Sequence, residues 1–418
     1  MFPILSRIFV PADYGAIDLL MVSAAFVTQF AQFGVPSGLQ RYYYKHEGAS
    51  RRTLVASSLI SVALFATLLG VGFFIWAPAF QGWFPPEQAG VVESIRWIAI
   101  ALPFFTIADQ TQLLLRLQGR AIAFSMVNVS KVVIQPVLTA IAVVGLDLGI
   151  RGVFLAHVAT AVAIALGTLV LVRHETTWRP DFGLAGELVR FGLPGHPAIL
   201  IVQAMQLLPR YVLASFAPLS AVGLFGIGLR VGGVQRVFVR AFARAWNPFA
   251  YANEGAPDEA RLYHLALRGT IALVCTSSLV LSVFASELLA VLGPPEYRAA
   301  AWLVPGIALH FAFEGLTPIF GTILYTRHAV KWTSIIATAR LVVFLALSLA
   351  WVPDGGATGL IAAMLVAVVL QTVAYVVVCR RLFPLSFPAV RLFFTLVLLG
   401  GIVYGTNQLA LPILTVLA

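Results

Sequence analysis

Apolar runs of about 20 residues recur along the whole 418-residue chain, and they limit its possible folds more than any other feature. A run of that length forms a helix that spans the hydrocarbon core of a bilayer. Hydrophobic residues make up 60% of the chain and charged residues 11%, whereas soluble domains carry about 25% charged residues. The pattern therefore predicts an all-α polytopic membrane protein. A transmembrane barrel would instead show roughly ten-residue alternating segments.

Breaks between the apolar runs predict twelve full transmembrane helices with partial apolar segments at both ends. The full spans are expected at 15–40, 53–79, 95–116, 121–145, 152–172, 190–214, 221–248, 264–292, 300–325, 332–352, 357–379 and 388–406. The partial segments are 1–10 and 408–418. All connections are short, so we expect no soluble domain on either side of the membrane.

The two halves of the chain repeat the same signals at an offset of 207 to 209 residues. The matched positions include Pro85-Pro86-Glu87 with Pro294-Pro295-Glu296, Arg120 with Arg327, Gly152 with Gly359, and Tyr14-Gly15 with Val222-Gly223. The repeat predicts two pseudo-symmetric six-helix bundles at 1–175 and 190–382. A cytoplasmic linker at 176–189 joins them, and extra C-terminal helices follow at 383–418. Two homologous bundles with a substrate path between them are the plan of a transporter.

The same repeat indicates that the first helix is truncated. Arg210 follows an apolar span that begins near residue 190, whereas its counterpart Arg7 has only six residues before it. Half a span would leave unpaired backbone groups in lipid. We therefore expect the native chain to start upstream of Met1; the alternative is that this chain has lost half a span.

The distribution of Lys and Arg predicts the orientation in the membrane. Seventeen of these residues lie at one set of helix ends and five at or near the other. Short cytoplasmic loops carry the excess of Lys and Arg. The connections at 45–52, 173–190 and 380–391 are therefore expected on the cytoplasmic side.

Four arginines lie within the predicted span 221–248. Arg230, Arg236, Arg240 and Arg244 fall within an arc of roughly 120° on a straight helix. An arginine at a helix centre costs at least ~2.5–3.5 kcal/mol against lipid. These side chains are therefore expected to line a hydrated lumen or to pair with acids. For Arg240 and Arg244 the alternative is that they extend to the interface.

Lys131 and Arg340 lie 209 residues apart, near equivalent points of the two halves. Matching cations suggest a pseudo-symmetric cavity with a cation on each wall, although a structural ion pair is the alternative. Arg41 precedes three tyrosines and Lys45, and Arg116 also ends a span. An aromatic and basic belt at the interface explains these two better than ligand contact, but both remain binding candidates.

The few intramembrane acids are Asp18, Asp109 and Glu314. Their function could be ion or proton coupling, or they could neutralise nearby arginines. His157 and His310 are also embedded, and packing explains such histidines more often than titration does.

The sequence contains none of the motifs that mark several classes of enzyme and ATP-driven transporter. The chain lacks a Walker A loop, HExxH, GxSxG and a metal-spaced Cys/His set. We therefore expect no enzyme activity, no cofactor and no metal, and no ATP-driven transport by this chain alone. The net charge of +10 belongs to membrane loops, so we expect no nucleic-acid partner.

The opening sequence PILSRIFVPADYGAIDLLMV, followed by FAQFGVPSGLQRYY, resembles the start of bacterial polysaccharide-repeat-unit flippases. These belong to the multidrug/oligosaccharidyl-lipid/polysaccharide (MOP) exporter superfamily, which also contains MATE exporters and lipid II flippases. The stretch from Arg7 through Pro11 to Tyr14-Gly15 is similar to the end of that family's first helix and its first outer turn.

The resemblance implies a V-shaped, MATE-like pair of bundles that encloses a cationic cavity in the bacterial inner membrane. The implied substrate is an undecaprenyl-diphosphate-linked oligosaccharide, and a polysaccharide polymerase and a chain-length regulator are possible partners besides membrane lipids. A diphosphate suits arginine, which binds phosphate oxygens in pairs. The headgroup residues expected from this are Arg230, Arg236, Arg240, Lys131 and Arg340.

Two departures from the family pattern stand out. Pro209-Arg210 occupies the place where many relatives have an Asp-Arg pair. The sodium-site acids of lipid II flippases have no match in 190–214, 332–352 or 357–379, which weakens a lipid II assignment. Two alternatives stay open: a MATE-like multidrug or cation antiporter, and a non-transporting component of a membrane glycan assembly complex.

Overall fold

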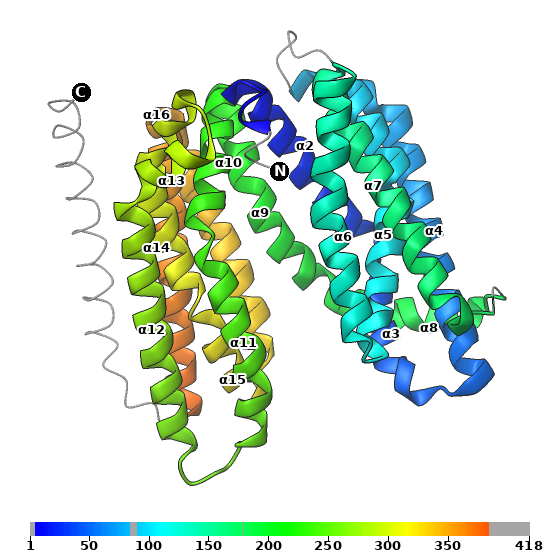
Figure 1. Ribbon diagram of the computed structural model, residues 1–418. Coiled ribbons are helices and arrows are strands. Elements are labelled where there is room, and N and C mark those ends of the chain that lie inside the picture. Colours follow the sequence, from blue (N-terminus) through cyan, green and yellow to red (C-terminus); the bar gives the residue numbers. More distant parts are fainter. Residues whose placement is uncertain (1–4, 84–89, 178, 384–418) are drawn as a thin grey trace, which may run out of the picture. The chain divides into compact units, whose positions relative to one another are not determined.

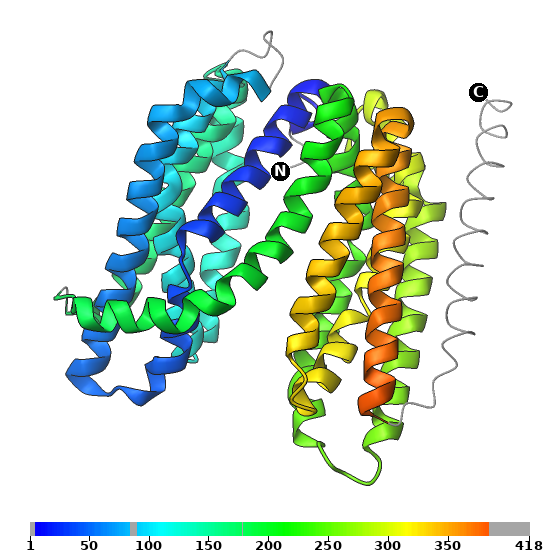
Figure 2. The same ribbon diagram turned by 180° about the vertical axis from the view of Figure 1, so that it is seen from behind.

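The computed structural model describes residues 5–83, 90–177 and 179–383, and all regular structure within these ranges is helical (Figures 1 and 2). Contacts divide the described residues into two compact units. Unit 1 holds the described part of 16–207, and unit 2 holds 5–15 and 208–383. Two helices, α2 (Pro11–Ala31) and α9 (His196–Phe216), pass from one unit to the other. The second unit boundary therefore lies inside α9, beyond the linker predicted at 176–189.

Within the described residues, nine helices are long and apolar enough to span a membrane. One further span is a bent helix pair, and the longest helix contains a kink that divides it into two arms. Counting the bent pair as one span and the two arms separately gives a segment for each of the eleven spans predicted between residues 15 and 379. The predicted span 388–406 and the tail 408–418 lie outside the described residues.

Unit 1 is built around α5 (Val91–Leu117), which packs against both α4 (Gly48–Trp76) and α7 (Gly149–Val172). Helix α6 (Ala121–Ala140), extended by a π-turn at Ile141–Gly145, packs against α7. The short helices α3 (Val35–Tyr42) and α8 (Phe182–Gly192) pack against each other at one end of the unit.

The span predicted as one helix at 15–40 is interrupted after α2. Phe33 and Gly34 adopt left-handed backbone angles, with φ of 47° and 78°, and α3 begins at Val35. Gly34 lies against the backbone of α8, where a Cβ would approach the amide nitrogen of Leu193 to 2.6 Å. Only glycine satisfies both requirements at this position. The break turns α3 away from α2 and onto α8.

Unit 2 is centred on α14 (Val304–Glu314), which packs against α10, α12 and α16. Its remaining elements are α10 (Leu219–Gly232), α11 (Gln235–Ala252), α12 (Glu259–Val283), α13 (Ala285–Leu292), the 3₁₀ segment η6 (Pro295–Leu303), α15 (Thr317–Thr326) and α16 (Lys331–Leu382). Helix α15 connects the outer elements, since it packs against both α11 and α16.

Helix α16 is 52 residues long and joins the two spans predicted at 332–352 and 357–379. It contains Pro353 and a non-helical residue, Gly356, with φ 50° and ψ −130°. Proline removes a backbone hydrogen bond and glycine accepts the positive φ. The two predicted helices are therefore the two arms on either side of this kink.

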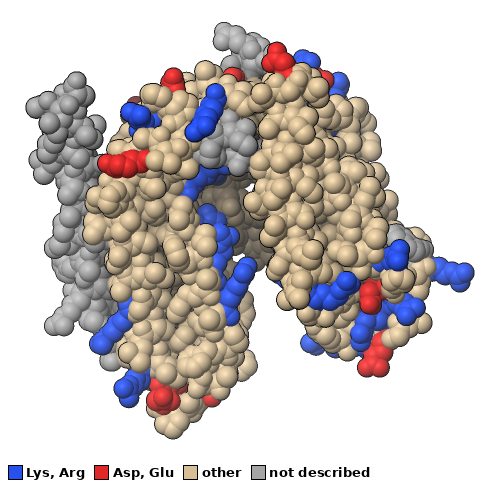
Figure 3. All heavy atoms as spheres, viewed as in Figure 1, with Lys and Arg blue, Asp and Glu red and all other residues tan. Residues whose placement is uncertain are grey.

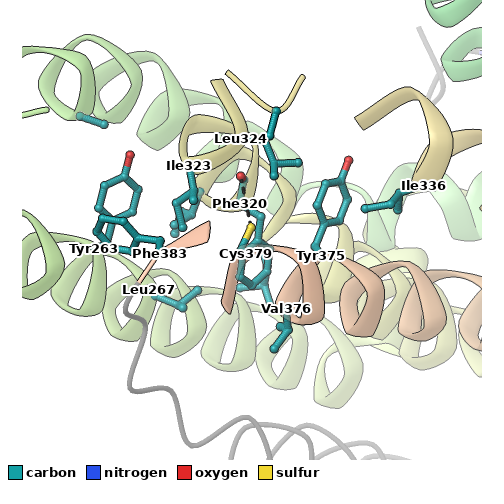
Figure 4. Close-up of a cluster of buried hydrophobic side chains, with 14 of the residues drawn as sticks. Tyr263, Leu267, Phe320, Ile323, Leu324, Ile336, Tyr375, Val376, Cys379 and Phe383 are labelled. Carbon is teal, nitrogen blue, oxygen red and sulfur yellow. Dashed lines mark hydrogen bonds between the residues drawn. The ribbon is translucent and has the colours of Figure 1, made fainter. Parts of the chain in front are cut away.

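Large apolar side chains form the core of unit 2 between α12, α15 and the second arm of α16 (Figure 4). The rings of Phe320 and Tyr375 stack at 6.1 Å with an interplanar angle of 8°. The thiol of Cys379 donates to the carbonyl oxygen of Phe320 at 3.7 Å. The indole nitrogen of Trp246 donates to Thr322 at 3.0 Å. These contacts fix α15 on α16 and give the neighbouring charged helices a rigid support.

Candidate functional site

A break between α10 and α11 shapes the cationic face of unit 2. The two helices meet at 45°, so the expectation of one straight helix over 221–248 is wrong. The buried side chain of Gln235 stabilises the break: its amide nitrogen donates to the carbonyl oxygen of Ala308 in α14. Its amide oxygen accepts hydrogen bonds from Ser277 and Ser278 of α12 at 3.0 and 3.1 Å. The glutamine thus joins three helices at the bend.

Three of the four predicted arginines follow this break on α11. Arg236, Arg240 and Arg244 are spaced four residues apart and therefore share one helix face. Arg240 and Arg244 are exposed and Arg236 is half-buried. None of the three forms an ion pair within the described part of the chain. Figure 3 shows a column of Lys and Arg atoms along the part of unit 2 that holds α10 and α11.

Aromatic rings hold two of these guanidinium groups. The Arg236 guanidinium lies over the ring of Phe311 at 4.8 Å, and that of Arg230, on α10, lies over Tyr14 at 5.4 Å. Arg240 donates from Nε to the backbone oxygen of Arg236 at 3.2 Å. The contacts of Arg236 and Arg240 orient these two cations without neutralising them, because neither an aromatic face nor a backbone carbonyl carries a net charge. We refer to Arg230, Arg236, Arg240 and Arg244 as the arginine face.

The predicted binding residue Arg340 lies in a buried polar network of unit 2. Only 9% of the residue is exposed. Its guanidinium contacts Glu314 at 3.3 Å, donates to Gln371 at 2.8 Å and lies 3.3 Å from Nε2 of His310. The other ring nitrogen of His310 lies 3.2 Å from the carbonyl oxygen of Met364. Arg340, which lies on the first arm of α16, thus connects that arm with α14 and with the second arm.

Unit 1 contains a separate cavity of about 600 Å³ between α2, α5, α6 and α7, with Gln203 from α9. Two of the predicted residues line it. Lys131 of α6 and Asp109 of α5 form an ion pair at 3.9 Å, with 35% and 47% of their side chains exposed. Asp109 also accepts a hydrogen bond from Gln32 at 3.3 Å. The cavity is therefore polar but close to neutral.

The two bundles thus contain corresponding acid–base pairs. Lys131 with Asp109 in unit 1 corresponds to Arg340 with Glu314 in unit 2, at offsets of 209 and 205 residues. The pair in unit 1 is accessible from a cavity, whereas the arginine in unit 2 is buried. The two pairs therefore differ in their exposure.

The remaining candidates lie outside the cavity of unit 1. Arg41, at the end of α3, lies over the ring of Phe191 at 6.0 Å, and Arg116, at the end of α5, lies over Phe124 at 5.7 Å. Both are exposed, as expected for an aromatic and basic belt. Asp18 is 3% exposed within α2 and does not line the cavity.

Sequence reasoning missed the glutamines. Gln235 and Gln371 lie inside apolar helices and make the hydrogen bonds that organise unit 2, and Gln135 lines the cavity of unit 1. Polar residues inside membrane helices usually have a structural or functional partner. Applied to amide side chains as well as to charged ones, this rule selects the three glutamines. Within the described residues no group of His, Cys, Asp and Glu is arranged to hold a metal.

Comparison with known proteins shows the family to which this chain belongs. Residues 1–250 match the family described as polysaccharide biosynthesis protein. The chain belongs to this family. A search of curated proteins finds no match.

Solved structures share the fold of this chain at low sequence identity. The lipid II flippase MurJ in an inward closed conformation has a TM-score of 0.73 and 12% identity, over 97% of this chain and 94% of MurJ. An inward-facing multidrug resistance MATE family transporter of the MOP superfamily has a TM-score of 0.70 and 15% identity, over 92% and 98%. The Vibrio cholerae MATE transporter VcmN in its bent form has a TM-score of 0.54 and 16% identity, over 89% and 87%. The fold is therefore the helical membrane fold of these transporters, as the opening motif predicted.

Proposed function

We propose that this protein is a flippase that moves undecaprenyl-diphosphate-linked oligosaccharides from the cytoplasmic to the outer face of the bacterial inner membrane. Membership of the polysaccharide biosynthesis family and the fold shared with a lipid II flippase support the class of substrate. The arginine face is the observation that carries the proposal. Three of its cations, Arg236, Arg240 and Arg244 on α11, have no ion-pair partner within the described residues, and a diphosphate supplies the matching charge.

The chemistry of the arginine face suits a diphosphate headgroup. Arginine is always charged, and its planar fork donates two parallel hydrogen bonds to phosphate oxygens. A free guanidinium in lipid is costly, so these side chains need water or an anion. The spacing of four residues along α11 places successive forks about 6 Å apart, which allows one diphosphate to contact two of them.

Within this proposal the acid–base pair of unit 1 is the candidate for coupling to an ion gradient. Asp109 is both exposed to a cavity and paired with Lys131. A proton or cation that bound to Asp109 would weaken its attraction to Lys131 and change the contacts between α5 and α6. Glu314 and Asp18 are weaker candidates, because Arg340 engages the first and the second is buried within α2.

A MATE-like cation antiporter is the second candidate, and Asp109 in the cavity of unit 1 is the observation that favours it. A cationic drug requires a free carboxylate, but Lys131 already offsets the charge of Asp109. The arginine face would repel such a drug. Export of a cationic dye that depends on Asp109 and persists without the arginines would establish this alternative.

The decisive experiment measures lipid-linked oligosaccharides in a deletion strain, with their sidedness probed by a membrane-impermeant reagent. Repeat units that accumulate on the cytoplasmic face support the proposal, and their mass identifies the glycan. Expression of the Arg236→Ala variant should fail to clear this accumulation. The matched control is Arg268→Ala, which removes an exposed arginine of α12 outside the arginine face. A deletion strain with normal surface glycan and no accumulated lipid intermediate would contradict the proposal.

A further inference from the structure

The cavity of unit 1 contains more hydrogen-bonding capacity than the protein itself uses. Gln29, Gln135 and Gln203 line it from α2, α6 and α9. The amide nitrogen of Gln29 donates to Gln32 at 3.0 Å, and the amide oxygen of Gln203 accepts from Gln206 at 2.8 Å. Within the described residues, the opposite end of each of these two amides makes no hydrogen bond.

Gln135 is the strongest indication that the cavity has a ligand. Its amide nitrogen is buried and has no hydrogen-bond partner within the described residues. His157, another lining residue, likewise has a buried ring nitrogen, Nδ1, without a partner there. A buried polar group without a partner costs about as much as a lost hydrogen bond. Two such groups around one cavity indicate that a polar ligand completes the site.

The charged residues of the cavity do not favour an anionic ligand. Lys131 and Asp109 pair with each other, so together they add no net charge that would hold a diphosphate. The remaining polar groups are amides, an imidazole and the hydroxyls of Thr28 and Thr160. Both threonines donate within their own helices, to Ala24 and Ala156, which leaves their oxygens able to accept.

These groups suit the hydroxyl and acetamido groups of a sugar. A hydroxyl donates one hydrogen bond and accepts others, and an amide offers both functions side by side. Phe105 packs against His157 at 4.9 Å between ring centroids and adds an apolar wall. The volume of about 600 Å³ is that of a small-ligand pocket.

We infer that the cavity of unit 1 is a saccharide subsite, which binds an uncharged sugar of the lipid-linked substrate through Gln135, Gln203 and Gln29. This inference rests on the proposed function. It assigns sugar recognition to the amides of unit 1, a task separate from the diphosphate recognition assigned to the arginines of unit 2.

The test compares two kinds of probe on the purified full chain in lipid nanodiscs. One probe is undecaprenyl diphosphate, and the others carry a single glucose, galactose, N-acetylglucosamine or N-acetylgalactosamine on that diphosphate. We expect at least one sugar to tighten the Kd about tenfold, the equivalent of one or two amide hydrogen bonds. Gln135→Leu should remove this gain and leave the Kd of the sugar-free probe unchanged.

Gln110→Leu is the matched control. Gln110 is also a buried glutamine with an unpartnered amide, but it does not line the cavity, so its loss should leave both Kd values unchanged. Gln203→Leu tests the same cavity from α9 and guards against misfolding of the first variant. The Gln135→Leu protein should melt no lower than the wild type, because the variant removes an unpartnered amide.

The outcomes separate the two proposals. Equal Kd values for all probes on the wild type, or a sugar gain that survives both Gln135→Leu and Gln203→Leu, would overturn the saccharide subsite alone. Failure of every probe, including sugar-free undecaprenyl diphosphate, to bind would overturn the proposed function itself.

Discussion

Gly15 and Gly223 are 208 residues apart in the chain, and their backbones pack directly against each other within unit 2. A Cβ on Gly15 would overlap the carbonyl oxygen of Leu219, and a Cβ on Gly223 would overlap that of Pro11. Pro11 and Leu219 are also 208 residues apart. The contact is therefore reciprocal: each glycine packs against the carbonyl of the residue four positions before the other glycine.

The close approach of α2 and α10 predicts that one added methyl group at this contact lowers the stability of the protein. Gly223→Ala should lower the free energy of unfolding by about 1–3 kcal/mol, because the new Cβ meets rigid backbone and no side chain can rotate away. Thermal unfolding in detergent, followed by intrinsic tryptophan fluorescence, measures the change. The control is Gly269→Ala in α12, where a Cβ meets nothing within 4 Å. It should be neutral or stabilise the protein by up to about 1 kcal/mol, and equal melting temperatures for the two variants would contradict the contact.

Two of the glycine matches that predicted the repeat lie where the structure leaves little room for a side chain. Gly152 and Gly359 show the same logic as Gly15 and Gly223. In each half this glycine packs against a carbonyl of the preceding helix or arm, that of Ala142 or that of Trp351. A glycine that close packing requires is therefore a signal that a comparison of the two halves of the sequence can detect.

Other features depend on contacts that a linear pattern does not contain. The helical arc predicted for the four arginines assumed a straight helix, and the break before Gln235 moved Arg230 onto a different helix from the other three. Gln235 holds the break through Ala308, which lies 73 residues away. Nothing local to 221–248 reveals that bond. Conversely, the separation of the spans 332–352 and 357–379 followed from local composition, since Pro353 and Gly356 lie between them.

The buried network around Arg340 predicts that this residue supports the fold. Arg340→Met should destabilise the protein by about 3 kcal/mol, because it leaves Glu314 and Gln371 without their partner. Breaking a fully buried ion pair costs about 3–5 kcal/mol. We expect the lower value here because 39% of the Glu314 side chain is exposed. Chemical unfolding in detergent measures the loss.

Two further variants make this prediction specific. Arg340→Met combined with Glu314→Gln should recover part of the loss, because it removes the uncompensated charge. Arg268→Met, at an exposed position of α12, should change the free energy by no more than about 0.5 kcal/mol. If Arg340→Met unfolds like the wild type but fails to bind undecaprenyl diphosphate, Arg340 contacts substrate after all.

The arginine face predicts a hydrated surface along α11. In a protein with Cys275 replaced by alanine, Arg240→Cys should react with a charged, membrane-impermeant thiol reagent about tenfold faster than Val280→Cys, since thiolate forms in water and not in lipid. Val280 is 47% exposed on α12, among apolar neighbours. The native Cys379 is fully buried and should give no background. Similar rates at positions 240 and 280 would show that α11 does not face water.

The pair of Lys131 and Asp109 predicts non-additive effects on transport. Asp109→Asn should reduce transport in proteoliposomes under an imposed proton or sodium gradient about tenfold, the size of a typical coupling between two sites, while binding of undecaprenyl diphosphate persists. Lys131→Met should act on the same step, because each change breaks the same ion pair, 3.9 Å apart. The double variant should therefore be no worse than the more defective single variant. Glu187→Gln, at an exposed position of α8, should keep the response to the gradient. Multiplicative losses in the double variant would mean that Lys131 and Asp109 act in separate steps, with Lys131 contacting substrate as a cation in its own right.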